Sequence, residues 1–250
     1  MLNHMKAHSG AGYFLLGFKL IRTKGVRRFV FIPLIVNLIL FASAFYYLFG
    51  RIDDLIIYTT NLLPNWLEGI EEAIAYFIWP LAVLTILLVA AYIFSTLANW
   101  IAAPFNGLLA EKMELILTGQ PTQNDDFLAL LKDIPRTLVR EFTKLKYYIP
   151  RAVVFLLIFF LLPVIGQVVW FLFSAWMMAV QYCDYPYDNH KVDFPKMRED
   201  LVKHKGYAYS FGTVVMLFSM IPIVNFLVMP VAICGATAMW VDRLKDRHTS

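Results

Sequence analysis

Two adjacent arginines, Arg27 and Arg28, follow Gly25 and stand directly before a long apolar run. Glycine lets the backbone approach a ligand closely, and the first N–H groups of a helix carry partial positive charge. Guanidinium groups add forked hydrogen-bond donors that fit an oxyanion. These three residues are therefore candidates for an anion site. The alternative is that the arginines only anchor the helix among lipid phosphates and keep this end in the cytoplasm.

Amide side chains within the apolar stretches are candidates for lining a pathway through a membrane. Neutral amides can replace part of an anion's hydration shell without holding the anion too tightly for release. Each amide can instead satisfy broken backbone or join neighbouring helices. The candidates are Asn37, Asn99, Asn106, Gln167 and Asn225.

The remaining reactive residue types indicate no metal, cofactor or nucleotide site. Cys183 and Cys234 form no CxxC pattern, so we interpret them as small apolar residues. The histidines show no ligand spacing, and the sequence holds no Walker phosphate loop. We expect no cofactor and no nucleic-acid partner.

The composition is that of an integral membrane protein. Of the 250 residues, 60% are hydrophobic and 16% are charged, against about 25% charged in a typical soluble domain. Four stretches lack Asp, Glu, Lys, Arg and His, and each exceeds the roughly 20 residues that cross a bilayer. They are 29–50, 73–110, 152–183 and 207–241.

The charges between these stretches predict the topology of a single membrane domain, 1–250. Residues 1–28 carry only basic charges and include a short interfacial helix capped by Ser9, whereas the loop 51–72 is mainly acidic. The positive-inside rule places the N-terminus inside, 51–72 outside and 111–151 inside. Two long membrane helices are therefore expected within 29–110.

The last two apolar stretches, 152–183 and 207–241, are predicted to be partly inserted, re-entrant hairpins. Each has a proline near its middle, in "LPVIGQ" and "IPIVNF". The helical arm before Pro163 spans ~17 Å, against a hydrocarbon core of about 30 Å. A hairpin also keeps the basic segment 184–206 inside, whereas a straight crossing would export it.

Residues 111–151 are expected to form an amphipathic helical head. Its apolar residues recur at three-to-four spacing, and the pattern predicts a helix pair broken at Pro135. Basic residues recur every four positions on another face, which predicts a stripe turned to lipid head groups or water. A substrate path is the alternative. The stripe consists of Lys132, Arg136, Arg140 and Lys144.

The chain resembles the CysZ family of bacterial inner-membrane sulfate permeases over nearly its full length. The stretches that carry the resemblance are "KGVRRFVFIPLIVNLILF" (24–41), "PFNGLLAEKMEL" (104–115), "YCDYPYDNH" (182–190) and "IPIVNFLVMPVAICGATAMW" (221–240). The resemblance implies sulfate uptake for cysteine synthesis, multi-pass insertion in the bacterial inner membrane and assembly into homo-oligomers. It also implies that Gly25, Arg27 and Arg28 bind sulfate, with sulfite or related oxyanions as further ligands.

The mechanism expected is a passive, channel-like pore, because the sequence shows neither ATP motifs nor carboxylates at membrane depth. Two other classes of function stay open. One is a membrane-surface enzyme acting on lipid phosphates, with Asp184, Asp188 and His190 as its loose polar cluster. The other is a membrane scaffold that transports nothing.

Overall fold

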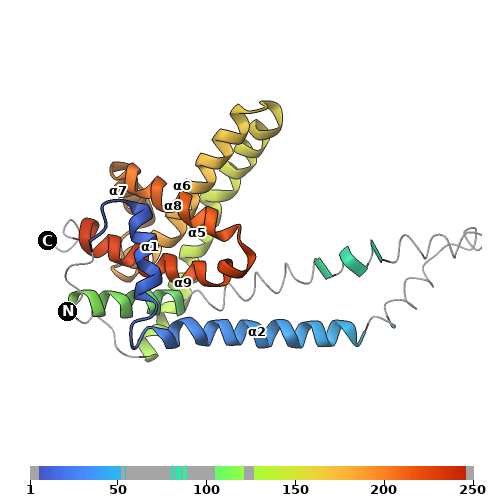
Figure 1. The fold of residues 1–250 in the computed structure, drawn as a ribbon, viewed down its shortest axis with the longest axis horizontal. Coiled ribbons are helices and arrows are strands. Elements are labelled where there is room, and N and C mark those ends of the chain that lie inside the picture. The colour runs from blue at the N-terminus through green and yellow to red at the C-terminus, as the bar shows by residue number, and fades with distance from the viewer. Residues whose placement is uncertain are drawn as a thin grey trace, which may run out of the picture. The chain divides into compact units, whose positions relative to one another are not determined.

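The protein is helical throughout the part that its computed structural model describes (Figure 1). The chain divides into two compact units, Met1–Ile32 with Ala103–Ser250, and Pro33–Ala102. The residues described are 6–51, 54, 80–81, 83–85, 87–88, 105–120 and 127–245.

The first helix, α1 (Gly10–Leu20), begins where the sequence predicts, because the Ser9 hydroxyl accepts a hydrogen bond from the Gly12 amide at 3.1 Å. Its buried residues repeat at helical spacing and pack against α8 (Lys205–Ser219) and α9 (Pro222–Met239). A methyl group on Gly17 would overlap the Val231 carbonyl oxygen, and one on Gly235 would overlap the Tyr13 carbonyl oxygen. Glycines on both helices thus allow α1 and α9 to pack backbone to backbone.

Helix α2 (Arg27–Phe49) is one uninterrupted helix that covers nearly all of the first apolar stretch, 29–50. Its described apolar side chains are largely exposed, including Phe31, Ile35 and Leu38. Such a surface is typical of a helix that contacts lipid. Residues 105–118 are also helical. The loop 51–72 and most of the second predicted membrane helix lie outside the described residues.

Helices α5 (Phe127–Leu161) and α6 (Ile165–Asn189) form a helical hairpin whose turn contains Pro163, as the sequence predicts. The expected break at Pro135 is wrong, because α5 runs through both Pro135 and Pro150. Proline removes one backbone hydrogen bond from a helix, but the neighbouring turns can remain helical around it. The helix is amphipathic, and its packing against α6 keeps the two halves in one element.

The rest of the first unit packs around α6. Helix α7 (Phe194–Lys203) follows the end of α6, and α8 and α9 form a second helix–turn–helix at Pro222. The π-helix η2 (Trp240–Leu244) then continues α9 without interruption. Both cysteines are free and buried, as predicted. The core holds large side chains from all of these elements, among them Tyr13, Tyr187, Phe211 and Trp240.

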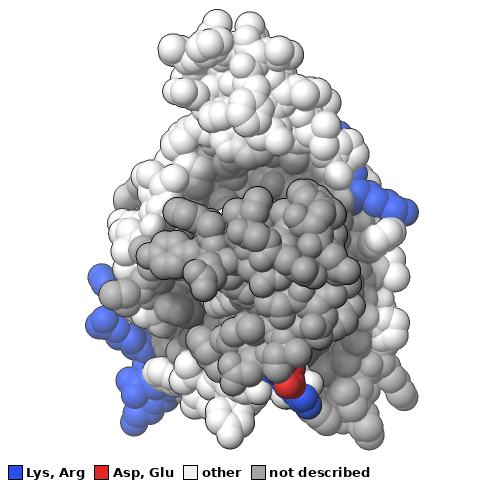
Figure 2. Space-filling view, turned by 90° about the vertical axis from the view of Figure 1, so that its right-hand side faces the viewer, with Lys and Arg blue, Asp and Glu red and all other residues white. Residues whose placement is uncertain are grey.

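Two described segments are long and apolar enough to cross a membrane, Ile165–Asn189 and Leu227–Leu244. The second is 72% buried inside the protein, so its apolar character also serves the core. The turn between α5 and α6 is different, because its apolar residues are exposed, including Leu161, Leu162 and Val164. Figure 2 shows this end of the hairpin at the top, free of charged side chains.

Candidate anion site and the polar network of the head

Gly25 lies in the short connection between α1 and α2, with a φ of +91°. This left-handed region is readily open only to glycine, so the residue type follows from the turn. Val26 is fully buried beside it, and its amide bonds the Thr23 carbonyl oxygen at 3.1 Å. The Val26 carbonyl oxygen accepts from the Phe29 amide at 2.9 Å. The connection is therefore anchored while Gly25 stays exposed.

Arg27 and Arg28 occupy the first turn of α2, and both side chains are exposed. Arg27 Nε donates to the Arg22 carbonyl oxygen at 3.0 Å, which ties the guanidinium to the connection. The guanidinium of Arg28 lies over the Phe29 ring at 4.9 Å. Neither arginine forms an ion pair with a carboxylate in the described part of the chain. Their terminal nitrogens are available to an anion.

A third basic residue, Lys112, lies next to Gly25. A Cβ added to Gly25 would sit 3.8 Å from Lys112 Cε, in ordinary van der Waals contact. Lys112 belongs to the helix at 105–118, far from Gly25 in the sequence. The sequence alone did not indicate Lys112, because the stretch "AEKMEL" is like many charged helical surfaces. Only the fold brings Lys112 close to Gly25.

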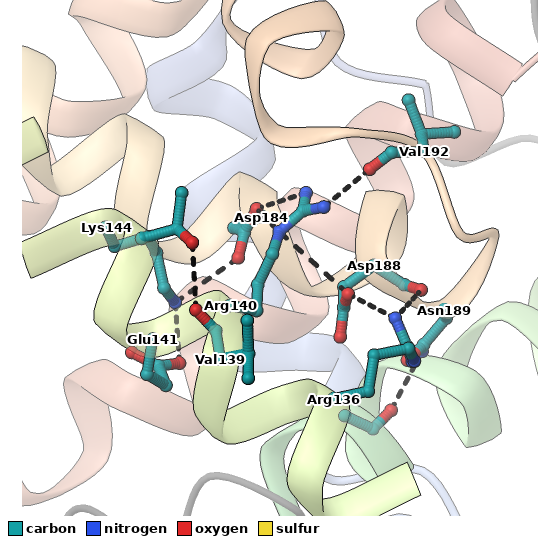
Figure 3. A network of polar contacts seen from close by, with 11 residues as sticks. Arg136, Val139, Arg140, Glu141, Lys144, Asp184, Asp188, Asn189 and Val192 are labelled. Carbon is teal, nitrogen blue, oxygen red and sulfur yellow. Dashed lines mark hydrogen bonds and ion pairs between the residues drawn. The ribbon is translucent and has the colours of Figure 1, made fainter. Parts of the chain in front are cut away.

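Three of the four residues of the basic stripe form an ion-pair network with acids, so our interpretation of the stripe as a lipid- or water-facing surface is wrong for Arg136, Arg140 and Lys144 (Figure 3). The side chain of Lys132 lies outside the described residues. Arg140 donates to Asp184 Oδ1 through Nε at 3.0 Å and Nη2 at 2.6 Å. Lys144 Nζ lies 3.3 Å from Asp184 Oδ2 and 2.6 Å from Glu141 Oε1. The side chains of Arg140 and Lys144 are only 11% and 5% exposed.

Two acids on α6, Asp184 and Asp188, lie one helical turn apart and match basic residues one turn apart on α5. Arg136 Nη1 contacts Asp188 Oδ1 at 2.6 Å. Arg140 Nη1 also donates to the Val192 carbonyl oxygen at 2.7 Å, which ties α5 to the residues after α6. A cleft of about 390 Å³ opens here, but acids already match most of the basic groups that line it.

Lys144 is charged in spite of its burial. Burial, the largest single effect, would lower the pKa of its ammonium group, but the attractions of Asp184, Tyr185 and Glu141 together outweigh it. The net pKa is raised, so the lysine stays protonated at every physiological pH. The network therefore consists of fixed charges that hold α5 against α6.

A second polar centre surrounds Glu114, whose side chain is fully buried on the helix at 105–118. His190 Nε2 lies 2.9 Å from both carboxylate oxygens, and Lys245 Nζ lies 2.8 Å from Oε1. Burial alone would raise the pKa of Glu114, but hydrogen bonds from His190 and Lys245 lower it overall. An ionised Glu114 therefore joins the end of α6 to the end of η2.

Three of the five amides predicted to line a pathway have described side chains: Asn106, Gln167 and Asn225. Asn106 is buried and donates to the Tyr185 hydroxyl at 3.2 Å, inside the polar network of the head. Gln167 and Asn225 are exposed near the turns of the two helical hairpins. Asn99 and the side chain of Asn37 lie outside the described residues.

The polar cluster considered for an enzyme does not converge on one point. Asp184 and Asp188 pair with basic residues of α5, whereas His190 turns to Glu114. Among the described residues, no group of three His, Cys, Asp or Glu side chains could hold a metal ion. The described carboxylates in this cluster serve as partners for cations.

Comparison with known proteins adds a family and one close relative. The family profile described as "Sulfate transporter CysZ/Etoposide-induced protein 2.4" matches residues 13–230. A protein from Pectobacterium atrosepticum, named "Sulfate transporter CysZ", is 52% identical over 242 residues. The match covers 95% of this chain and 86% of that protein. Both descriptions denote a transporter, and neither denotes an enzyme.

Proposed function

The chain belongs to the family of sulfate transporter CysZ and etoposide-induced protein 2.4, and on this basis we propose that it imports sulfate across the bacterial inner membrane. The sulfate would supply cysteine biosynthesis. Gly25, Arg27 and Arg28 are the residues that we propose to bind it. The observation that carries the proposal is a contrast: Arg27 and Arg28 form no ion pair within the described part of the chain, whereas Arg136 and Arg140 of α5 are paired with acids.

The chemistry of sulfate suits such a site. Sulfate is a fully deprotonated dianion at neutral pH, so it accepts hydrogen bonds and donates none. The site offers donors only: the guanidinium nitrogens and the amides of Arg27 and Arg28 in the first turn of α2. Residues 1–28 contain no carboxylate that could accept the proton of hydrogen phosphate. This composition favours sulfate, with sulfite and related oxyanions as further ligands.

The two helical hairpins are proposed to enter the membrane and return on the side they came from. His190 precedes α7, α8 and α9, and Lys245 follows them, yet both residues contact Glu114. One crossing between them would separate them by a hydrocarbon core of about 30 Å. The shared carboxylate therefore supports a re-entrant hairpin. The exposed apolar turn between α5 and α6 supports the same arrangement for the first hairpin.

The transport mechanism that we propose is a passive pore, since the sequence holds no ATP-binding motif. Moving a dianion inward against 100 mV costs about 4.6 kcal/mol, at ~2.3 kcal/mol per charge. Net uptake then depends on rapid consumption of sulfate in the cytoplasm. Homo-oligomers would provide walls for the pore and would cover part of the exposed apolar surface of α2.

The direct test is uptake of radiolabelled sulfate into liposomes that contain only the purified protein. We expect flux down the sulfate gradient without ATP, and a response to an imposed voltage. Flux that requires a proton or sodium gradient would overturn the passive mechanism but keep transport. Liposomes that take up no sulfate would favour a scaffold, and turnover of lipid phosphates in the same vesicles would favour an enzyme.

A further inference from the structure

We propose that Lys112 is a third basic ligand of the anion that binds at Gly25, Arg27 and Arg28. This inference rests on the proposed function, because it assigns a further residue to the same site. It makes the site a junction between two segments, the start of α2 and the helix at 105–118. An anion bound there would attract basic groups of both segments and would therefore hold the two segments together.

The geometry places Lys112 on the side of Gly25 where a side chain would otherwise stand. Its Cε would be 3.8 Å from a Cβ at Gly25, and the ammonium group is one bond beyond Cε. Gly25 therefore leaves the space between its backbone and the lysine open. An oxyanion held by the amides of Arg27 and Arg28 would lie within reach of this ammonium group.

The charge of Lys112 has no counter-charge in the described part of the chain. Lys112 forms no ion pair there, although its side chain is partly buried. Glu114 lies two positions further on and is already held by His190 and Lys245. Residues two apart on a helix do not face each other, so Glu114 cannot also serve Lys112.

Lys144 is a lysine with a structural role, and its surroundings differ from those of Lys112. Its ammonium group contacts both Asp184 and Glu141, and its side chain is 5% exposed. Lys112 is also a lysine on a helix of the first unit, but it faces a glycine next to two further unpaired basic residues. Arg27 and Arg28 are exposed and Lys112 is partly buried, and like charges near one another repel unless an anion lies between them.

The third charge has a consequence for selectivity. The attraction between a ligand and a fixed charge is proportional to the ligand's charge, so sulfate gains about twice as much from Lys112 as nitrate does. We expect the loss of this charge to weaken sulfate binding about tenfold or more. Nitrate binding would weaken only about threefold, the square root of that factor.

The test compares three single variants, and the double variant with alanine at Arg27 and Arg28, by isothermal titration of the purified full chain with sulfate and with nitrate. Lys112→Met removes the charge but retains a side chain of similar length against Gly25. Lys112→Arg restores the charge. Lys196→Ala removes an exposed lysine of α7 and serves as the matched control. Thermal unfolding without sulfate shows whether each variant is folded.

The inference predicts a larger loss for sulfate than for nitrate in Lys112→Met, recovery in Lys112→Arg, and wild-type binding in Lys196→Ala. Unchanged sulfate binding in Lys112→Met would overturn the role of Lys112. If replacement of Arg27 and Arg28 by alanine still abolishes binding, the proposed function survives that result. If neither replacement changes binding, both the site and the further inference are wrong. Equal losses for sulfate and nitrate would also reject a direct charge contact.

Discussion

Arg140 on α5 holds a single carboxylate oxygen of Asp184 on α6 through two nitrogens, at 3.0 and 2.6 Å. The other oxygen of the same carboxylate faces Lys144 at 3.3 Å. Asp184 is almost completely buried, so these two basic groups replace the water that would otherwise solvate it. The pair joins the two arms of the first helical hairpin far from its apolar turn, toward the hairpin's open end.

Neutralising Asp184 should therefore destabilise the hairpin. We expect Asp184→Asn to lower the free energy of unfolding by about 3–5 kcal/mol, because Arg140 and Lys144 lose the buried carboxylate that they share. Asp193→Asn is the matched control, since Asp193 is exposed and makes no side-chain capping bond in α7. Its effect should stay within about 0.5 kcal/mol. Equal effects in detergent unfolding experiments would contradict a structural role for the network.

The double replacement of Arg27 and Arg28 by lysine separates an anion site from a topology signal. Lysines keep the positive charge that orients the helix, but they lose the planar donor forks and the Nε tether to the Arg22 carbonyl oxygen. We expect normal membrane insertion with weaker sulfate binding and slower uptake at low sulfate concentration. Alanines should cost about 1.5–3 kcal/mol for each charged hydrogen bond lost. Titration and liposome flux on one preparation measure both effects, and unchanged binding would leave only the topology role.

Gly25→Ala tests whether the turn itself is needed. Alanine at a φ of +91° is strained, although its methyl group would meet Lys112 only in ordinary contact. We expect weaker sulfate binding, because the connection must change shape and move the first amides of α2. Gly119→Ala is a close control, with a φ of +72° and open space around the added methyl group. If both variants lose the same affinity, the effect reports general destabilisation.

The lowered pKa of Glu114 predicts how the stability of the protein depends on pH. Its folded-state pKa lies below the ordinary value of 4.5, so its contribution is present above about pH 4.5 and is lost as the pH falls through the lowered value. Glu114→Gln should be less stable than the wild type at pH 7, by about 3 kcal/mol for a broken buried pair. The difference should shrink below pH 4.5 in thermal unfolding. A constant difference across this range would refute the assignment.

Side-specific labelling tests the re-entrant hairpins. Cysteines at positions 191 and 245 should react from one side of the membrane, and a cysteine at position 53 from the other. The two native cysteines are buried and can be replaced by alanine to remove the background. Labelling of 191 and 53 from the same side, with 245 opposite, would mean that each of the two hairpins crosses the bilayer.

Local signals in the sequence predicted the helix boundaries well where one residue controls them. Ser9 caps α1 as expected, and the helical turns at Pro163 and Pro222 lie where the prolines indicated. Pro135 was misleading, because tertiary packing along α6 maintains a helix that local propensity would break. A proline with long helical arms on both sides therefore predicts a boundary less reliably than one beside a short arm.

The charged residues could not be assigned from the sequence, because their roles depend on contacts between distant segments. Arg140 and Asp184 are 44 positions apart, and no spacing rule connects them. The same limit applies to Lys112. Its neighbour Gly25 belongs to the first of the two sequence segments that form the first unit, whereas Lys112 belongs to the second. Arg27 and Arg28 were identified because the glycine, the arginines and the helix start are adjacent in the chain.

The backbone contact between Gly17 and Val231 also has a consequence for biogenesis. The N-terminal helix leaves the ribosome first, but its packing partner α9 is almost the last element made. At 5–20 residues per second, α1 waits about 10–40 s for that partner. The connection that carries Gly25 directly follows α1, so we expect it to reach its final shape only after α9 has been made. A nascent or truncated chain would therefore reach the membrane before it could bind an anion.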